Sequence, residues 1–240
     1  MKKHILNRLE RTMEMDAIKF LRIFGITWEN LNLSKHENAD VRALKARWAK
    51  QLLDLIKVQM QVSGQVDPTS EPLILVGNHS SYLDIPLVTC ALPSSCFVSK
   101  AEVKKWPIIG PAATKGGTIF VKRESQHSRK NVRSQILDAL VKEKKKVVIF
   151  PSGTTTLGPS DKWRKGPFEI AYEGGIKIQT FRIWWSPARL VAYIDDDFLL
   201  SHVFNLFGLS EIKGHLEFGD SFYVQDVMRD LTRAKAWCEG

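Results

Sequence analysis

Apolar residues recur with helical spacing along the first thirty residues of the chain. Ile5, Leu9, Met13, Phe20 and Phe24 are separated by four or seven positions, and lysines and arginines fall largely on the other faces. This spacing predicts a basic amphipathic helix over residues 1–30. Such a helix is typical of an interfacial membrane anchor, but core-packed helices with the same pattern are also common.

The helical pattern resumes over residues 38–62. Its apolar stripe consists of Val41, Leu44, Trp48, Leu52, Leu55 and Val58. Lysines and arginines again lie between the apolar positions, and Gly64 and Pro68 mark a break to the next region. The sequence therefore predicts an amphipathic helical hairpin over residues 1–62 that docks on a membrane, followed by a catalytic domain over residues 63–240.

From about residue 70 onward, short β-rich runs alternate with helical segments. Strands are predicted near residues 73–77, 96–99, 117–121, 147–150, 179–185, 189–194 and 215–223. Helices are predicted near residues 84–91, 101–106, 128–144, 166–173 and 226–237. Alternation of this kind is typical of an α/β domain in which helices flank a mixed, largely parallel sheet.

Composition and charge narrow the function classes. The 240 residues are 44% hydrophobic and 25% charged, which is enough apolar material for a buried core. The net charge of +9 indicates an anionic partner, although solvated lysine-rich faces also explain such an excess. No nucleic-acid-binding module is recognisable, so we expect a membrane surface or an acidic carrier protein instead of nucleic acid.

The cysteines and the apolar runs place further limits. Cys90, Cys96 and Cys238 are odd in number and lack the spacing of a disulfide framework or a zinc site, so we expect a reducing compartment and no metal. No apolar run reaches the roughly 20 residues that span a bilayer. The N-terminus also lacks the apolar core of a signal peptide. We therefore expect a protein that lies on a membrane without crossing it.

One polar turn carries candidate chemistry. The strand predicted at residues 73–77 is followed by Asn78-His79-Ser80-Ser81, and Asp84 opens the next predicted helix. Across such a corner, Asp84 can hold one imidazole nitrogen of His79 and leave the other free to act as a base. The spacing alone is weak, because His215 and Asp220 share it within a strand-like segment. Further motifs along the chain distinguish the two pairs.

Four segments occur in a specific order: residues 78–84, residues 99–110, Gly116-Gly117 through Arg123, and Phe150-Pro151-Ser152-Gly153-Thr154. Together they resemble the glycerophospholipid acyltransferase family, typified by bacterial 1-acylglycerol-3-phosphate acyltransferases. The resemblance covers about residues 70–185, and the hairpin before it is similar to the membrane-docking hairpin of compact bacterial members. It implies a peripheral enzyme on the cytoplasmic face of the bacterial inner membrane.

The resemblance also implies a role for each matching residue. His79 would take the proton from a lysolipid hydroxyl, whose oxygen attacks an acyl thioester, and Asp84 would fix the His79 tautomer. No covalent acyl-enzyme and no cofactor are implied. The donor would be acyl-CoA or an acylated carrier protein. Gly117 would let the backbone approach the substrate, and Arg123 and Lys100 would bind phosphate.

The fourth segment departs from the family pattern, which is usually Phe-Pro-Glu-Gly-Thr-Arg-Ser. Ser152 stands in place of the glutamate and Thr155 in place of the arginine, while Gly153 and Thr154 match. We assign Ser152, Gly153 and Thr154 to substrate binding by this resemblance. A threonine cannot pair with a phosphate dianion, so the acceptor headgroup stays open, although Arg164 or Lys165 could compensate.

Three hypotheses follow from these residues. The first is an acyltransferase that converts 1-acylglycerol-3-phosphate to phosphatidate. The second keeps the reaction but uses a lysolipid without phosphate, such as a lyso-aminolipid. The third is a non-catalytic relative that binds lipid or nucleic acid. Thiol release from an acyl thioester in the presence of different acceptors distinguishes them.

Overall fold

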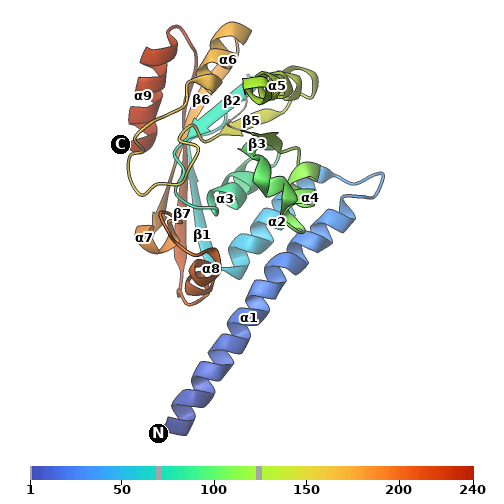
Figure 1. Ribbon diagram of the computed structural model, residues 1–240, viewed down its shortest axis with the longest axis vertical. Coiled ribbons are helices and arrows are strands. Elements are labelled where there is room, and N and C mark those ends of the chain that lie inside the picture. Colours follow the sequence, from blue (N-terminus) through green and yellow to red (C-terminus); the bar gives the residue numbers. More distant parts are fainter. Residues whose placement is uncertain (1, 69–71, 123–125) are drawn as a thin grey trace.

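A mixed sheet forms the centre of the molecule (Figure 1). The computed structural model describes residues 2–68, 72–122 and 126–240. In these ranges the strands are β1 (Val58–Ser63), β2 (Leu73–Gly77), β3 (Ser95–Lys100), β4 (Ile119–Val121), β5 (Lys146–Ile149), β6 (Lys177–Ser186) and β7 (Ile212–Tyr223). Their order is β1-β7-β6-β2-β5-β3-β4, and only the β6–β7 pair is antiparallel. The predicted mixed, largely parallel sheet is confirmed.

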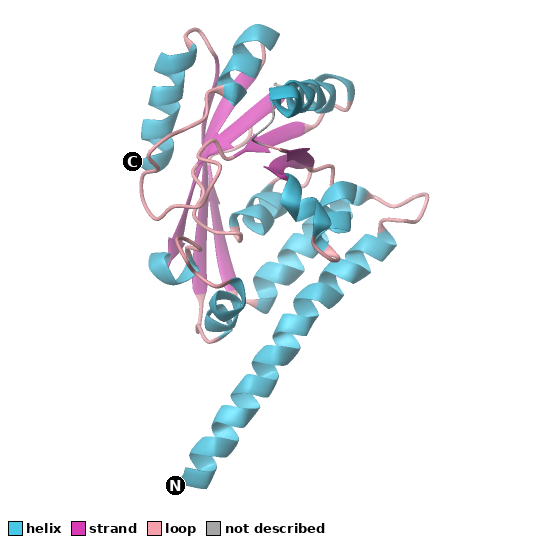
Figure 2. Ribbon diagram, in the orientation of Figure 1, coloured by secondary structure: helices cyan, strands magenta, loops and turns pink. Residues whose placement is uncertain are grey.

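Helices cover both faces of the sheet (Figure 2). They are α1 (Lys2–Leu33), α2 (Val41–Leu55), α3 (Asp84–Ala91), η1 (Ala101–Lys105), α4 (Ile109–Lys115), α5 (Gln126–Leu137), η2 (Asp138–Lys142), α6 (Gly166–Gly174), α7 (Ala188–Val191), α8 (Leu199–Phe207) and α9 (Val227–Glu239). Side chains of α2, α3 and α8 pack on one face of the sheet, and those of α6 and α9 pack on the other.

The central strand β2 explains why two cores form. Its residues alternate between the faces, so Leu73 and Leu75 enter the core beneath α3, while Ile74 and Val76 enter the core beneath α6 and α9. All four are fully buried. A strand buried on both faces reads as a continuous apolar run, which is why the sequence pattern located it correctly.

The second predicted helix is shorter than expected. It ends at Leu55, and residues 58–63 form β1, which pairs in parallel with β7. The segment Val-Gln-Met-Gln-Val-Ser alternates apolar and polar residues with the period of a strand, so a helix over residues 38–62 was the wrong prediction there. The predicted boundary between residues 62 and 63 lies within this strand. The strand predicted at residues 189–194 is also wrong, because α7 begins at Ala188.

Helices α1 and α2 form the expected hairpin but differ in their surroundings. Helix α2 packs against α3 and contributes Leu53 to the core. The N-terminal part of α1 runs beyond the sheet and its flanking helices (Figure 1). In the described part of α1, Ile18, Leu21 and Trp28 are exposed at spacings of three and seven positions. Among the described residues, no helix is both long and apolar enough to traverse a bilayer.

The parallel strands bring distant segments to one edge. Strands β2, β5, β3 and β4 run in the same direction, so their carboxyl ends lie at a common edge of the sheet. His79 follows β2, Phe150 follows β5, and Lys100 ends β3. Ligand sites in open α/β sheets commonly lie at this edge, and here it carries the candidate chemistry.

Candidate active site

His79 and Asp84 meet across the turn between β2 and α3. His79 Nδ1 lies 2.7 Å from Asp84 Oδ2. Because a carboxylate oxygen can only accept, Nδ1 carries the proton and Nε2 keeps its lone pair. The His79 side chain is 18% exposed, whereas Asp84 is fully buried. The predicted pair therefore has the geometry of an oriented base, and we call residues 78–84 the His79 turn below.

Three further donors fix the Asp84 carboxylate. The backbone amides of Ser80 and Ser81 donate to Oδ2 at 2.8 Å and 3.1 Å, and Trp185 Nε1 donates to Oδ1 at 2.8 Å. Asp84 is also the first residue of α3, where the helix dipole favours negative charge. Both oxygens of the carboxylate thus accept hydrogen bonds, which fixes its position beside the His79 ring.

Phe150 supports the imidazole from one face. The two ring centroids are 4.1 Å apart and the ring planes differ by 14°. Phe150 in turn lies edge-on to Phe181, which is fully buried. This stack limits rotation of the His79 ring and gives it an apolar neighbour of the kind that an acyl chain requires. The sequence showed that Phe150 begins a motif, but it did not reveal that Phe150 stacks on the base.

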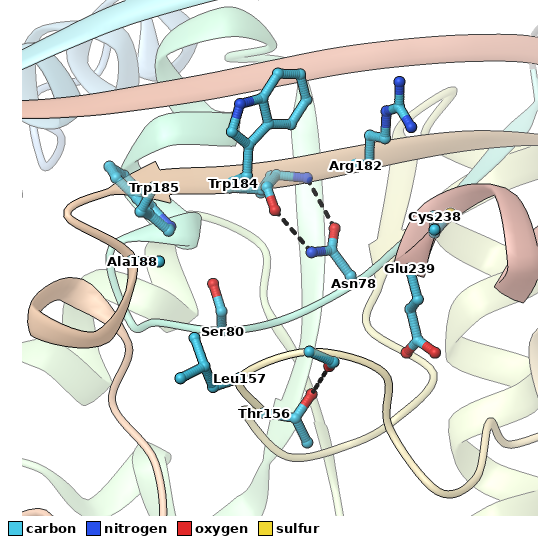
Figure 3. Close-up of a pocket in the computed structure, with 13 residues that line it drawn as sticks. Asn78, Ser80, Thr156, Leu157, Arg182, Trp184, Trp185, Ala188, Cys238 and Glu239 are labelled. Atoms are coloured by element: carbon cyan, nitrogen blue, oxygen red, sulfur yellow. Dashed lines mark hydrogen bonds between the residues drawn. The ribbon is translucent and has the colours of Figure 1, made fainter.

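Hydrogen bonds from the Asn78 side chain and from the backbone tie the His79 turn to three other segments. Asn78 donates from Nδ2 to the carbonyl of Ile183 and accepts from the Ile183 amide, both at 2.7 Å (Figure 3). The amide of Thr156 donates to the carbonyl of His79 at 2.8 Å, and the amide of Tyr193 donates to that of Ser80 at 2.9 Å. The turn is therefore held in place from β6 and from two loops.

The Pro-Ser-Gly-Thr segment lies beside the base but satisfies its own polar groups. Ser152 Oγ donates to the carbonyl of Thr154 at 2.7 Å, and the Thr155 hydroxyl donates to the carbonyl of Tyr193. Gly153 has a φ of 71°, in the left-handed region that favours glycine. The segment follows Phe150 directly, so Ser152, Gly153 and Thr154 lie at the carboxyl edge of the sheet, and their role in substrate binding stays a prediction.

The other predicted substrate-binding residues are dispersed. Lys100 is exposed at the carboxyl end of β3. Gly117 adopts a φ of 83° before β4 begins, and a Cβ there would lie 2.9 Å from Lys145 Nζ. Lys145 precedes β5, so Gly117 sits at the amino edge of the sheet, opposite His79, where it serves the turn into β4. Arg123 lies outside the described residues.

Comparison with known proteins decides the family. The sequence model of the family described as Acyltransferase matches residues 59–184. A lyso-ornithine lipid O-acyltransferase of Pseudomonas aeruginosa is 36% identical over 207 residues, which cover 82% of this chain and 78% of that relative. This chain belongs to the acyltransferase family. The resemblance drawn from the four sequence segments is confirmed, and the chain is an enzyme of the transferase class.

One further relative and one solved structure are similar to the acyltransferase. A 1-acyl-sn-glycerol-3-phosphate acyltransferase of Neisseria gonorrhoeae is 27% identical over 145 residues, covering 60% of this chain and 54% of the relative. The crystal structure of the 1-acyl-sn-glycerophosphate acyltransferase of Thermotoga maritima aligns with a TM-score of 0.68. That alignment covers 100% of this chain and 97% of the other at 18% identity, so it shows a shared fold.

A cavity of about 440 Å³ lies behind the His79 turn of the acyltransferase, on the side of α9. Asn78 and Ser80 line it together with Arg182 and Glu239, whereas His79 does not (Figure 3). Arg182 pairs with Glu217 at 2.8 Å. The cavity therefore adjoins Asn78 and Ser80, whereas the His79 ring stacks on Phe150.

The acyltransferase has no cluster of metal ligands in the described ranges, where no three His, Cys, Asp or Glu side chains come together. Buried thiols are not activated either. Burial raises the pKa of Cys96 to about 11 and raises the pKa of Cys238 further, so neither sulfur is a ready nucleophile. Trp185 is the site residue that sequence reasoning missed, because nothing near it in the sequence signals a contact with Asp84.

Proposed function

We propose that this acyltransferase moves a fatty acyl group from an acyl thioester to the hydroxyl of a lysolipid. The observation that carries the proposal is the 2.7 Å contact between His79 Nδ1 and the buried Asp84, which leaves Nε2 free as a base. The names of the relatives support an O-acyl transfer to a lysolipid. Either acyl-CoA or an acylated carrier protein can supply the thioester.

The reaction balances with His79 as the only proton carrier. Nε2 of His79 takes the hydroxyl proton while the hydroxyl oxygen forms a bond to the thioester carbonyl carbon. The carbon–sulfur bond then breaks, and the departing thiolate takes the proton from the imidazolium. Asp84 stays ionised and stabilises the imidazolium between the two steps. No acyl-enzyme and no cofactor enter this scheme.

For the acceptor, we favour a lyso-aminolipid over 1-acylglycerol-3-phosphate. The fourth segment itself offers no cation, because Ser152 and Thr155 replace the charged residues of the usual block and donate to backbone carbonyls instead. A phosphate monoester needs positive partners at this position more than a zwitterionic amino-acid headgroup does. The name of the Pseudomonas relative supports the same choice. 1-Acylglycerol-3-phosphate remains the second candidate.

An acceptor panel tests the proposal directly. Thiol release would be followed with acyl-CoA and with an acylated carrier protein, using lyso-ornithine lipid and lysophosphatidate as acceptors. We expect release with at least one acceptor, faster with lyso-ornithine lipid. The folded variant His79→Ala should lose at least several hundredfold in rate. Near-normal transfer by that variant would eliminate the proposed base, and no release with any pairing would favour a non-catalytic lipid-binding protein.

We also propose that the enzyme docks on the cytoplasmic face of the membrane through α1. The exposed stripe of Ile18, Leu21 and Trp28 supports this role, because these apolar side chains have no core to enter. The variant Ile18→Ser/Leu21→Ser should sediment less with vesicles than the wild-type chain. Equal sedimentation of the two proteins would assign membrane binding to another surface.

A further inference from the structure

Some exposed lysines of this protein form ion pairs with an acidic side chain, and others do not. Lys50 pairs with Asp54, and Lys142 pairs with Asp138, at 2.8 Å and 2.7 Å. Lys104 and Lys105 are also exposed, yet neither has an ion pair within the described ranges. They lie on η1, which packs against α4. Glu102 supplies one negative charge on the same segment, and Lys104 Nζ lies 5.8 Å from the ring centroid of Phe120, so the lysines outnumber the acid there and leave this surface positively charged.

A large aromatic side chain accompanies these lysines. Trp106 follows Lys104 and Lys105 directly and is 47% exposed. A tryptophan in water is costly, because much of its apolar ring area stays hydrated. Lysine and tryptophan together are the residues that proteins place at the headgroup layer of a membrane, where the indole is amphipathic and the ammonium meets lipid phosphates.

A strained turn holds this aromatic at the corner between η1 and α4. Ile108 has φ 63° and ψ −49°, and the amide of Ile109 donates to the carbonyl of Pro107 at 2.6 Å. These features define a γ-turn, and a positive φ is unfavourable for a β-branched residue such as isoleucine. Strained backbone of this kind concentrates at functional sites. The sharp reversal leaves Trp106 on the outside of the corner.

The position of the corner connects α1 with the catalytic edge. Helix α4 packs against α1, and Figure 1 shows α4 beside the C-terminal half of that helix. Segment η1 begins directly after Lys100, at the sheet edge that also carries His79. The surface thus lies between the helix that exposes Ile18 and Leu21 and the edge where a lipid acceptor must arrive.

We propose that Lys104, Lys105 and Trp106 form a second membrane contact that binds an anionic lipid bilayer. We call these three residues the lysine–tryptophan surface. The lysines attract lipid phosphates, and the indole enters the headgroup layer. With α1 they turn the catalytic edge toward the bilayer. The inference rests on the proposed function only in that the acceptor is a lipid, and it adds a contact that α1 does not provide.

Vesicle binding by the full chain tests this surface. The probes are vesicles of phosphatidylcholine alone and of phosphatidylcholine with phosphatidylglycerol, without any acyl donor. The variant Lys104→Gln/Lys105→Gln should bind the anionic vesicles roughly 30-fold more weakly, because each lysine near an anionic surface contributes about 5-fold. The difference should shrink as salt is added. Trp106→Ser should weaken binding to both kinds of vesicle.

The chain offers a matched control at the opposite edge of the sheet. Lys142→Gln/Lys144→Gln removes the same charge from exposed positions before β5 and should keep near wild-type binding. Equal loss in both double variants would show that only total charge matters and would overturn the proposal. The proposal would also be overturned if Lys104→Gln/Lys105→Gln binds vesicles like the wild-type chain but has a raised KM for the acylated carrier protein and an unchanged KM for acyl-CoA. That result would make this surface a binding site for the carrier protein.

Two measurements separate this proposal from folding defects and from the proposed reaction. Circular dichroism should show wild-type helix content in the lysine variants. If the double variant unfolds, Lys105→Gln alone should still bind anionic vesicles about 5-fold more weakly than the wild-type chain. Transfer to an acceptor dispersed in detergent should be unchanged, because none of these side chains belongs to the His79 site. If the lysine variants lose vesicle binding but transfer normally in detergent, the membrane contact is supported. Loss of transfer by His79→Ala tests only the proposed reaction and says nothing about this contact.

Discussion

Trp185 is the residue whose removal tests the structure of the catalytic pair most sharply. Its indole Nε1 is the only donor to Asp84 Oδ1 in the described part of the chain, and both side chains are buried. Replacing Trp185 by phenylalanine keeps an aromatic ring but leaves that carboxylate oxygen unpaired. Loss of a buried hydrogen bond to a charged group, with a smaller ring in the core, should lower the free energy of unfolding by about 2–4 kcal/mol.

The same change should slow transfer. Without Trp185, the carboxylate of Asp84 can rotate about its remaining donors and carry the His79 ring with it. A displacement on the order of 1 Å costs up to about 100-fold in rate, so we expect kcat to fall between about 10-fold and 100-fold with KM little changed. Urea unfolding followed by circular dichroism measures the first effect, and thiol release measures the second.

Trp184→Phe is the matched control. Trp184 is 43% exposed and stacks on His215 with ring centroids 5.0 Å apart, away from Asp84. Its replacement should change the free energy of unfolding by less than about 1 kcal/mol and leave kcat intact. If Trp185→Phe unfolds at a lower urea concentration yet transfers at the wild-type rate, Trp185 is a packing residue, and its role in positioning the base is refuted.

Three further predictions concern the hydrogen bonds of Asn78 to β6, the buried Lys45 and the choice of acceptor. Asn78→Ala leaves the amide and the carbonyl of Ile183 unpaired and should cost about 2–3 kcal/mol in urea unfolding, a loss that Asn78→Asp should restore only in part. Burial lowers the pKa of Lys45 from 10.5 to about 8 in the folded chain. Between pH 8 and 10.5 the unfolded chain therefore binds more protons than the folded chain, and the free energy of unfolding should rise by up to about 3 kcal/mol as the pH increases across this range. Burial raises the pKa of Cys96, which should lower the free energy of unfolding over part of the same pH range. The difference between the wild-type chain and Lys45→Met in the pH dependence of this free energy therefore isolates the effect of Lys45, and the same pH dependence in both proteins would contradict the prediction. Ser152→Glu/Thr155→Arg restores the usual family block and should raise kcat/KM for lysophosphatidate by about 10-fold or more, and no gain would show that another segment selects the headgroup.

Features that depend on neighbouring residues in the chain could be predicted from the sequence. His79 and Asp84 lie within one turn, so a strand, a polar corner and a helix start were enough to bring them together. The central strands were found because β2 is apolar on both faces. The order of the four motifs supplied the acyltransferase family, which a lone pair of residues could not indicate.

Contacts across long sequence distances escaped prediction for a physical reason. Trp185 reaches Asp84 only because β6 pairs with β2, and Phe150 reaches His79 because β5 pairs with β2 on the other side. Sequence patterns do not specify such pairings. Gly117 was assigned to the substrate from a motif, and that role stays a prediction; its left-handed φ of 83° belongs to the turn before β4, at the amino edge of the sheet. The strand β1 was missed because a helical stripe runs directly into its alternating pattern.

The backbone amides that hold the His79 turn have a consequence for how this enzyme tolerates change. Thr156 and Tyr193 support the turn through main-chain nitrogens, which every residue type except proline provides. Their side chains can therefore change during evolution without removing the hydrogen bonds that hold the His79–Asp84 pair. A proline at either position is the single replacement that would remove the support outright.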